Sequence, residues 1–512
     1  MGGAQDLVHD LLVIGGGING AGIARDAAGR GLKVALVEAG DFAGGTSSAS
    51  TKLIHGGLRY LEFHAWGLVR KALAEREVLL DIAPHISWPQ SFVLPQGPKS
   101  VGGGRPDWML RAGLFLYDHL ARRRAVQGSS RIDLRQDRAG RALTDKDATA
   151  FRYWDGWVDD ARLVIANLQD AVAKGAQVFS RTPALSAMRV DGVWQVKLGG
   201  GSQLLARQVV NAAGPWAGDV AGRVLGLADA PGLKLVQGSH IVTRRVHLGR
   251  DAFMLQQPDG RIVFVIPYER DFSLIGTTER TIGHPDEAQV SEDEVRYLLD
   301  AANRWLARPL VEADIVHRFV GVRPLVLEAG KGERETTRDW RIVTHEAGGA
   351  LSVVGGKLTT YRLLAQDVVG RISGGQKGWT HAAALPGGDV PREAGEHGQT
   401  AFARWLDQLV AAQENYDPRL VRRLAHTLGT AAAPLLEAGL GRNIGGLFEA
   451  ELVHYRNHEW AQTSEDVLWR RTRMGLHIGA AGRAAVAEWF GEEAGPAQPE
   501  LPFTHRFGRL PR

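Results

Sequence analysis

Three glycines near the start of the chain have the spacing of a dinucleotide-binding loop. Gly15, Gly17 and Gly20 fit the pattern G-x-G-x-x-G, and an acidic residue, Glu38, follows about 20 residues later. In such a loop the first glycine permits a tight turn, the second lets the backbone approach a pyrophosphate, and the third lets a helix pack closely on a strand. Glu38 can accept hydrogen bonds from a ribose diol and disfavours a 2′-phosphate. The pattern therefore predicts a bound nucleotide cofactor.

The elements that must position this loop are also visible in the sequence. An apolar run over 11–14 predicts a buried strand, 21–28 predict a helix, and 33–37 predict a second strand that ends at Glu38. In a chain with 64 glycines the pattern alone would be a weak signal, and a glycine-rich surface loop is the alternative. The strand–helix–strand context favours the nucleotide site. A position at the extreme N-terminus is typical of flavoproteins, so FAD is the predicted cofactor and NAD is the alternative.

A dense group of hydroxyl side chains follows the predicted ribose acid. The group could be a solvated Ser/Thr loop, but the basic, aromatic and glycine residues over 52–60 favour a backbone held close to a planar ring. Together with the glycine loop, this region gives the following predicted cofactor contacts: Gly15, Gly17, Asn19, Gly20, Glu38, Thr46, Ser47, Ser48, Ser50, Lys52, Leu53, His55 and Gly57.

Composition limits the classes of protein to which this chain can belong. It has 512 residues, of which 44% are hydrophobic and 23% charged, as expected for a globular protein of about three domains. A net charge of only +4 is not typical of a nucleic-acid-binding protein. The absence of cysteine excludes disulfides, iron–sulfur clusters and cysteine catalysis, so redox chemistry must come from an organic cofactor. We found neither a signal peptide nor an apolar run of ~20 residues, and we expect a cytoplasmic location.

A series of longer motifs makes a family resemblance recognisable. Nearly the whole chain resembles the FAD-dependent, respiratory sn-glycerol-3-phosphate dehydrogenases. The motifs that carry this resemblance are, in order, GGGINGAG (15–22), TSSASTKLIHGGLRYLE (46–62), WVDDARL (157–163), GPWAG (214–218), GSHIV (238–242), IGTTE (275–279), GVRPL (321–325) and GGKLTTYR (355–362).

The resemblance implies oxidation of glycerol 3-phosphate to dihydroxyacetone phosphate, with electrons passing through FAD to quinone. A dianionic phosphate needs several cations, and forked arginines suit it. Arg59, Arg323 and Lys357 lie inside the matching motifs, whereas Arg338 is carried by a shorter match. Other implied contacts are Tyr60, Thr277 and Thr278 to substrate hydroxyls, and Gly214, Trp216, Gly356, Lys357, Leu358 and Thr359 to the cofactor.

The C2 hydroxyl of such a substrate must lose its proton as hydride leaves C2. A base with a near-neutral pKa is suited to this step. We predict that His240, at the start of a strand-rich block, is this base, with Arg323 beside it in the catalytic site. His55 is the alternative base, although it could instead contact the cofactor. A single histidine is also often structural.

The chain is expected to have a mixed α/β fold of three parts. The predicted FAD-binding part is Rossmann-like, of the glycine-oxidase or glutathione-reductase type, and comprises 1–85, 150–235 and 336–384. A substrate-binding antiparallel sheet comprises 86–149 and 236–335, and a helical domain comprises 385–512. Other predicted helices are 68–80, 157–174 and 291–306, and Thr463 to Asp466 fits a helix cap.

Residues 107–124 form a short apolar segment that ends in three arginines. It is either a buried helix with a solvated basic end, or a helix in a membrane interface with Trp108, Leu114, Phe115 and Leu116 inserted. The second interpretation would hold the protein peripherally on the cytoplasmic membrane, where quinone is reached. Oxygen as acceptor, an amine or amino-acid oxidase, a non-catalytic redox module and a homodimer all remain open.

Overall fold

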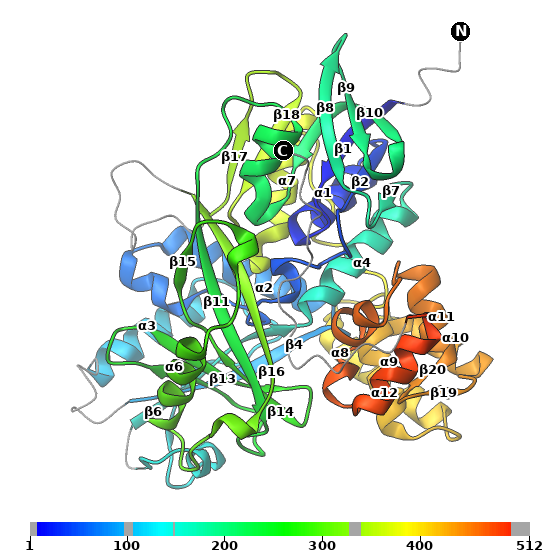
Figure 1. Cartoon of the computed structure of the whole chain (residues 1–512). Helices are drawn as coiled ribbons and strands as arrows, with labels where there is room; N and C mark the ends of the chain where they lie inside the picture. Colours follow the sequence, from blue (N-terminus) through cyan, green and yellow to red (C-terminus); the bar gives the residue numbers. More distant parts are fainter. Residues whose placement is uncertain (1–7, 97–105, 147–148, 327–338, 493–512) are drawn as a thin grey trace.

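The computed structural model describes residues 8–96, 106–146, 149–326 and 339–492. Within these ranges the chain forms two large sheets and a group of helices near its C-terminal end (Figure 1). The expected mixed α/β architecture is therefore confirmed, with a Rossmann-like part, a largely antiparallel sheet and a C-terminal helical domain.

One sheet contains β1, the strand that leads into the glycine loop, and we call it the cofactor sheet. The strand β1 lies near its centre. Its order is β17-β18-β10-β1-β2-β7, and β1 pairs in parallel with both β2 and β10. The apolar side chains of β1 are buried on both faces, which explains why this strand reads as a continuous hydrophobic run. The strands are β1 (Val8–Ile14), β2 (Val34–Val37), β7 (Gln177–Phe179), β10 (Gln203–Asn211), β17 (Arg341–Thr344) and β18 (Ala350–Val354), and the hairpin β8 (Ala184–Val190) and β9 (Val193–Leu198) pairs with β10.

Three helices pack together beside this sheet, namely α1 (Ile18–Gly29), α4 (Asp160–Ala173) and α7 (Tyr361–Ile372). Small residues of α1 allow the close approach, since a Cβ on Gly22 would lie 2.7 Å from the ring of Tyr361. The helix expected over 157–174 begins later than predicted. Trp157 and Val158 end a strand, and Asp159 caps α4 by accepting a hydrogen bond from the Arg162 backbone N–H at 3.1 Å.

The second sheet is the predicted substrate sheet. Its order is β15-β11-β14-β13-β12-β4-β6-β3, with β16 beside β11 and β5 beside β6. Both β3 and β6 belong to it, so this sheet takes residues that the expected boundaries at 85 and 150 assign to the cofactor part. The strands are β3 (Leu53–Ile54), β4 (Ser87–Pro95), β5 (Ser130–Asp133), β6 (Thr149–Val158), β11 (Leu233–Arg244), β12 (Ala252–Gln256), β13 (Ile262–Tyr268), β14 (Phe272–Gly276), β15 (Arg280–Ile282) and β16 (Ile315–Val326).

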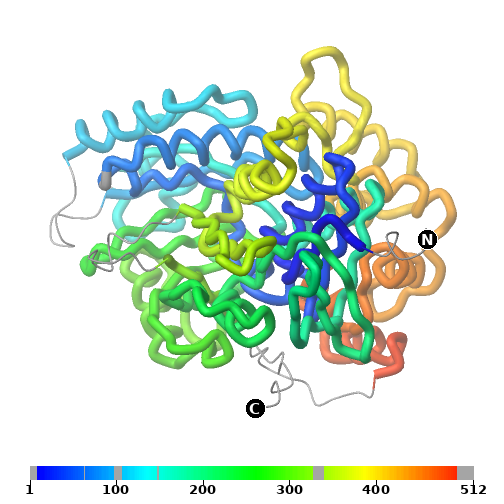
Figure 2. Tube along the Cα trace, turned by 90° about the horizontal axis from the view of Figure 1, so that it is seen from above, coloured from blue at the N-terminus to red at the C-terminus, as the bar shows by residue number. Residues whose placement is uncertain are grey.

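Helices α2 (Trp66–Ile82), α3 (Asp107–His119) and α6 (Glu292–Asn303) accompany this sheet. The C-terminal helices form a separate hydrophobic core, and they lie against the cofactor part in both views (Figures 1 and 2). Thr463 accepts a hydrogen bond from the Asp466 N–H at 3.2 Å, which confirms the predicted cap. These elements are α8 (Gly398–Ala412), α9 (Pro418–Leu428), α10 (Ala432–Ala438), the hairpin β19 (Asn443–Ile444) and β20 (Leu447–Phe448), α11 (Glu449–His458), a π-helix (Asp466–Arg471) and α12 (Ala480–Trp489).

Candidate active site

A cavity of about 2450 Å³ lies between the two sheets. The ends of β1, β2, β10 and β18 reach it from the cofactor sheet, and residues of β11, β12, β13 and β16 reach it from the substrate sheet. Ligands of parallel α/β sheets bind at the carboxyl ends of the strands, which is where this cavity opens.

The glycine loop forms one end of this cavity. Gly15 has a φ of +116°, a conformation that side chains disfavour, and it lies on the wall with Gly17. Gly20 is off the wall, where a Cβ would meet the Gly15 carbonyl oxygen at 1.9 Å, so its role is to pack α1 on β1. Glu38 lies on the wall and accepts backbone N–H groups of Gly16 at 2.6 Å and Gly40 at 2.8 Å. Burial raises the pKa of Glu38.

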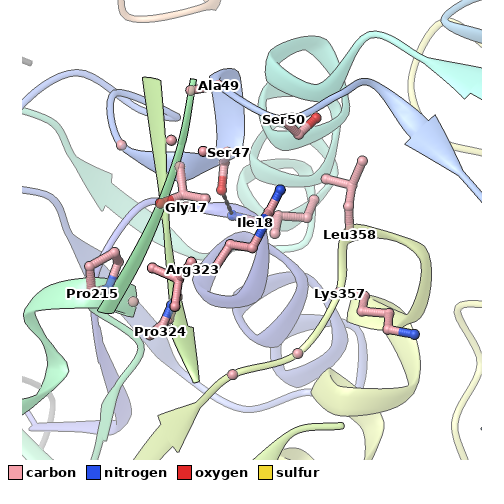
Figure 3. Close-up of a pocket in the computed structure, with 18 of the residues that line it drawn as sticks. Gly17, Ile18, Ser47, Ala49, Ser50, Pro215, Arg323, Pro324, Lys357 and Leu358 are labelled. Atoms are coloured by element: carbon pink, nitrogen blue, oxygen red, sulfur yellow. Dashed lines mark hydrogen bonds between the residues drawn. The ribbon is translucent and has the colours of Figure 1, made fainter. Parts of the chain in front are cut away.

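The hydroxyl loop, residues 41–52 between β2 and β3, lines the cavity beside the glycine loop. Ser47 accepts the Ile18 N–H at 2.9 Å, directly at the start of α1 (Figure 3). Thr46 donates to the Val322 carbonyl at 2.6 Å, and Ser50 donates to Asp160 at 2.7 Å. The loop therefore ties the two sheets together where a pyrophosphate would lie.

Two predicted cofactor contacts of this loop lie off the cavity wall. Lys52 is 1% exposed, and its ammonium group binds the Asp160 carboxylate at 2.7 Å and the Ser48 carbonyl at 3.0 Å. Ser48 likewise is not part of the wall. This placement corrects the expectation, because the charge of Lys52 is used to bury an aspartate behind the loop rather than to face a ligand.

Further parts of the wall come from β3, η7 (Gly214–Trp216) and the connection between β18 and α7. Leu53, His55 and Gly57 lie there, and the His55 N–H donates to the Thr359 hydroxyl at 3.2 Å. Asn19 of α1 donates to the Gly355 carbonyl at 3.3 Å. The remaining predicted cofactor contacts on this wall are Gly214, Trp216, Gly356, Lys357, Leu358 and Thr359.

His240 lies on β11 of the substrate sheet, between β14 and β16, and on the cavity wall. Its Nε2 shares a hydrogen bond with the Thr51 hydroxyl at 2.9 Å, and its ring stacks on Phe319 with centroids 4.8 Å apart. Burial, and then the positive charges of Arg323 and Lys52, lower the pKa of His240 to about 3. The imidazole is therefore neutral at physiological pH, but its pKa lies well below the near-neutral value expected for the base.

The predicted ligands of the phosphate and of the substrate hydroxyls share the cavity with His240. Arg59, Tyr60, Thr277, Arg323 and Lys357 all line the cavity. The Lys357 ammonium lies 3.8 Å from the centre of the Tyr60 ring, and Arg323 lies 3.5 Å from Glu279. Arg323 comes from β16 and Lys357 from the β18–α7 connection, and in Figure 3 the Lys357 ammonium group points away from Arg323.

Thr278 and Arg338 were also predicted to contact the substrate. Thr278 is off the wall, because its hydroxyl donates to Glu294 at 2.6 Å and accepts the Ser239 N–H at 2.9 Å. The expected substrate contact of Thr278 is therefore corrected, because its hydroxyl supports β11 instead. Arg338 lies outside the described residues.

The structure adds Asp155 to the wall, a residue that sequence reasoning missed. Asp155 accepts hydrogen bonds from Arg76 and Tyr117, each at 2.9 Å, and burial raises its pKa to about 6. An aspartate in the apolar run of β6 was the available signal.

Comparisons with known proteins agree with this geometry. Residues 10–362 match the family model of the FAD dependent oxidoreductases, and residues 379–495 match the C-terminal domain of alpha-glycerophosphate oxidase. The chain is 44% identical to the aerobic glycerol-3-phosphate dehydrogenase of Escherichia coli K12, over 94% of this chain and 97% of that protein. It is 46% identical to the D-erythritol 1-phosphate dehydrogenase of Brucella abortus, over 95% of this chain and 98% of that protein.

Solved structures give the same grouping. A glycerol-3-phosphate dehydrogenase from Bacillus halodurans, complexed with FAD, covers 94% of this chain and 90% of its own with a TM-score of 0.73 and 27% identity. The chain therefore belongs to the FAD-dependent oxidoreductases and, within them, to the family of the flavin-dependent glycerol-3-phosphate dehydrogenases.

The described residues fit FAD as the cofactor. The glycine loop leaves the backbone open to a pyrophosphate, Glu38 is placed for a ribose, and the cavity continues from there to His240. His240 and Arg323 line this same cavity.

Proposed function

We propose that this protein oxidises sn-glycerol 3-phosphate at C2 to dihydroxyacetone phosphate. The observation that carries the proposal is that a neutral histidine, His240, and a cationic residue, Arg323, share the wall of the cavity that the dinucleotide loop enters. A base and a phosphate ligand next to a flavin site are what this reaction needs. The names of the relatives support the same substrate.

Bound FAD supplies the acceptor of the hydride that leaves C2. The chain's own residues do the rest. Arg323, Arg59 and Lys357 bind the phosphate dianion and thereby fix C2 in the cavity. His240 accepts the hydroxyl proton at Nε2, the nitrogen that already shares a hydrogen bond with Thr51.

Substrate binding also makes His240 a stronger base. Arg323 depresses the pKa of His240, after burial, because a second positive charge nearby disfavours imidazolium. A phosphate dianion bound to Arg323 offsets that charge. The proton affinity of His240 therefore rises when the substrate is in place.

D-Erythritol 1-phosphate is a second candidate substrate. The relative of that name is as similar to this chain as the glycerol-3-phosphate dehydrogenases are. A longer polyol phosphate would present the same phosphate and secondary alcohol, with further hydroxyls that Glu279, beside Arg323, could accept. Comparing kcat/KM for the two phosphates decides between them.

We further propose that the electrons pass to quinone at the cytoplasmic face of the membrane. Helix α3 exposes Trp108 at 69%, Phe115 at 64% and Met109 at 45%, while its opposite face is buried. Arg122 and Arg124 are exposed just beyond the helix, where lipid phosphates would lie. Within the described residues, every helix is too short or too polar to cross a membrane.

Leu114 does not belong to the exposed face of α3, although we expected it there. Leu114 is only 2% exposed and packs in the core beneath α3, so it cannot enter lipid. Helical periodicity places Trp108 and Phe115 on the other face.

Anaerobic bleaching of the flavin tests the proposed function. Glycerol 3-phosphate should bleach the yellow holoenzyme, and a quinone analogue should restore the colour faster than oxygen does. An amino-acid oxidase would be bleached by amines instead, and a non-catalytic flavoprotein by neither. Faster reoxidation by oxygen would identify an oxidase.

A further inference from the structure

The C-terminal helical domain holds the hydroxyl loop from behind at two places. The first place is Asp41, the first residue of the loop, four residues after the end of β2. Asp41 is fully buried and binds Arg470 at 2.5 Å and both terminal nitrogens of Arg471 at 2.8 Å. Two arginines of one short π-helix thus fix the start of the loop.

The second place is the other end of the loop, which Arg473 reaches through Asp160. Arg473 lies 2.9 Å from both Asp159 and Asp160. Asp160 in turn accepts hydrogen bonds from the backbone N–H of Ser50 at 3.1 Å and from its hydroxyl at 2.7 Å. It also binds Lys52 at 2.7 Å, so one buried carboxylate connects the domain to Ser50 and Lys52 at the end of the loop.

Lys52, Asp160 and Arg473 form a buried ion group, which is stable only when all three charges are present. Lys52, Asp160 and Arg473 are 1%, 0% and 4% exposed, and removing one partner from a buried ion group leaves an uncompensated charge. Although burial opposes it, the charges of Lys52 and Arg473 keep the pKa of Asp160 below its usual value.

The backbone of the loop also needs external support. Ala43 and Lys52 have φ values of +62° and +60°, which residues with side chains rarely adopt. Such conformations persist only where the surroundings determine them. At Lys52 the surroundings are the ion group and, through it, the C-terminal domain, whereas the Ala43 backbone N–H donates to the Gly16 carbonyl at 3.0 Å.

The other side of the same loop faces the cofactor. Ser47 holds the N-terminus of α1, Thr51 contacts His240, and Ser50 lies on the cavity wall. The described strands of both large sheets end by residue 354, so the C-terminal domain contributes no described strand to either sheet. It meets the wall of the cofactor cavity through this loop and through Arg181, which binds Asp466 at 2.8 Å.

We propose that the C-terminal domain clamps the hydroxyl loop over the flavin and so retains the cofactor, with Arg470, Arg471 and Arg473 as positioning residues. The proposal rests on flavin binding and is independent of which phosphate is oxidised. It assigns to the domain a role in cofactor affinity that is separate from the chemistry.

Arg473→Gln in the holoenzyme tests the clamp. We expect the FAD dissociation constant, measured by ultrafiltration at fixed temperature, to rise about tenfold or more, because the loop loses its tether and a buried carboxylate its partner. During slow heating, flavin fluorescence should appear at a lower temperature than loss of the far-UV circular dichroism signal. Arg473→Lys keeps the charge and should recover part of the affinity.

Arg423→Gln is the matched control. Arg423 binds Glu451 at 2.7 and 2.8 Å entirely within the C-terminal domain and touches no part of the loop. This variant should lower the unfolding temperature without separating flavin release from unfolding. If Arg423→Gln raises the FAD dissociation constant as much as Arg473→Gln does, the domain acts only through general stability and the proposal is wrong.

A milder variant covers the case in which Arg473→Gln does not fold. Asp159→Asn weakens the hold of Arg473 but keeps the side-chain oxygen that caps α4. It should raise the FAD dissociation constant by a few-fold, in proportion to the single charge lost. Unchanged affinity in every folded variant would overturn the proposal. None of these measurements uses a substrate, so their failure is distinct from failure of the proposed activity.

Discussion

Gly276 faces His240 across β14 and β11, and a Cβ at Gly276 would lie 2.1 Å from Cδ2 of the imidazole. The ring is held on its other side by Phe319, with planes only 11° apart. The imidazole thus lies between Gly276, where there is no room for a side chain, and the ring of Phe319. These two neighbours fix the direction of the imidazole in the cavity.

Gly276→Ala should therefore impair catalysis by moving a residue that is not itself changed. We expect kcat to fall at least about tenfold, since small displacements of a catalytic group cost that much or more. FAD content should stay stoichiometric, because the nearest atoms to a Cβ at Gly276 belong to His240 and not to the glycine loop. His240→Gln should give a larger loss of kcat with the same FAD content. A Gly276→Ala enzyme with the parent kcat would show that the position of His240 does not matter.

Arg323→Ala should weaken the use of the phosphate substrate. Loss of a strong charged contact of about 3 kcal/mol corresponds to a fall in kcat/KM of about 100-fold. Arg318→Ala is the control on the same strand, since Arg318 binds Glu292 and Glu312 at the surface. The two variants are compared by steady-state kinetics with glycerol 3-phosphate, and equal effects would argue against a substrate contact.

Gly17→Val should remove the flavin. A Cβ at Gly17 already lies 3.0 Å from the Ser47 hydroxyl oxygen, and the branched side chain would occupy the wall where the pyrophosphate is expected. Purified Gly17→Val protein should lack the visible flavin absorption, whereas Gly370→Ala, where a Cβ meets nothing within 4 Å, should keep it. Full flavin content in Gly17→Val would refute this placement of the cofactor.

Trp108→Asp combined with Phe115→Asp should release the protein from anionic liposomes in a flotation assay. Interfacial binding depends on buried apolar area, and these two side chains provide the most exposed part of α3. Met188→Asp is the control, because Met188 is 61% exposed on β8 of the cofactor sheet. Flavin reduction by substrate should survive in all variants. Continued flotation of the double variant would place the membrane contact on another surface.

Glu459→Gln should destabilise the protein at neutral pH and less so in acid. Burial opposes ionisation, but Arg162 and then His454 hold the pKa of Glu459 at about 2, against 4.5 for the free group. Its stabilisation, roughly 3 kcal/mol, is present above pH 4.5 and lost as the pH falls through 2. Urea unfolding at pH 7 and pH 3 measures it, and Glu437→Gln, at an exposed position, is the matched control.

The parts of the fold that depend on neighbouring residues could be predicted from sequence. The glycine loop, β1 and α1 follow from spacing and apolar periodicity within about thirty residues. Lys52 could not be placed, because its partners Asp160 and Arg473 are distant in sequence, and no local pattern distinguishes a buried ion group from a phosphate ligand. Leu114 was assigned to the wrong face of α3, because periodicity identifies two faces without saying which one meets the core. Trp157 lies in β6 because pairing with β4 outweighs local helix preference.

The central position of β1 in its sheet has a consequence for how each molecule is made. Its neighbours β2 and β10 end at residues 37 and 211, so one edge of the first strand waits for its partner while nearly two hundred residues are synthesised. At ribosomal rates of about 5–20 residues per second, this wait is roughly 10 to 40 seconds. The strand β18 and the arginines that secure the hydroxyl loop emerge later still. Flavin capture is therefore a late event in biogenesis, and the unfilled edge of β1 is the point at which a newly made chain most needs protection from aggregation.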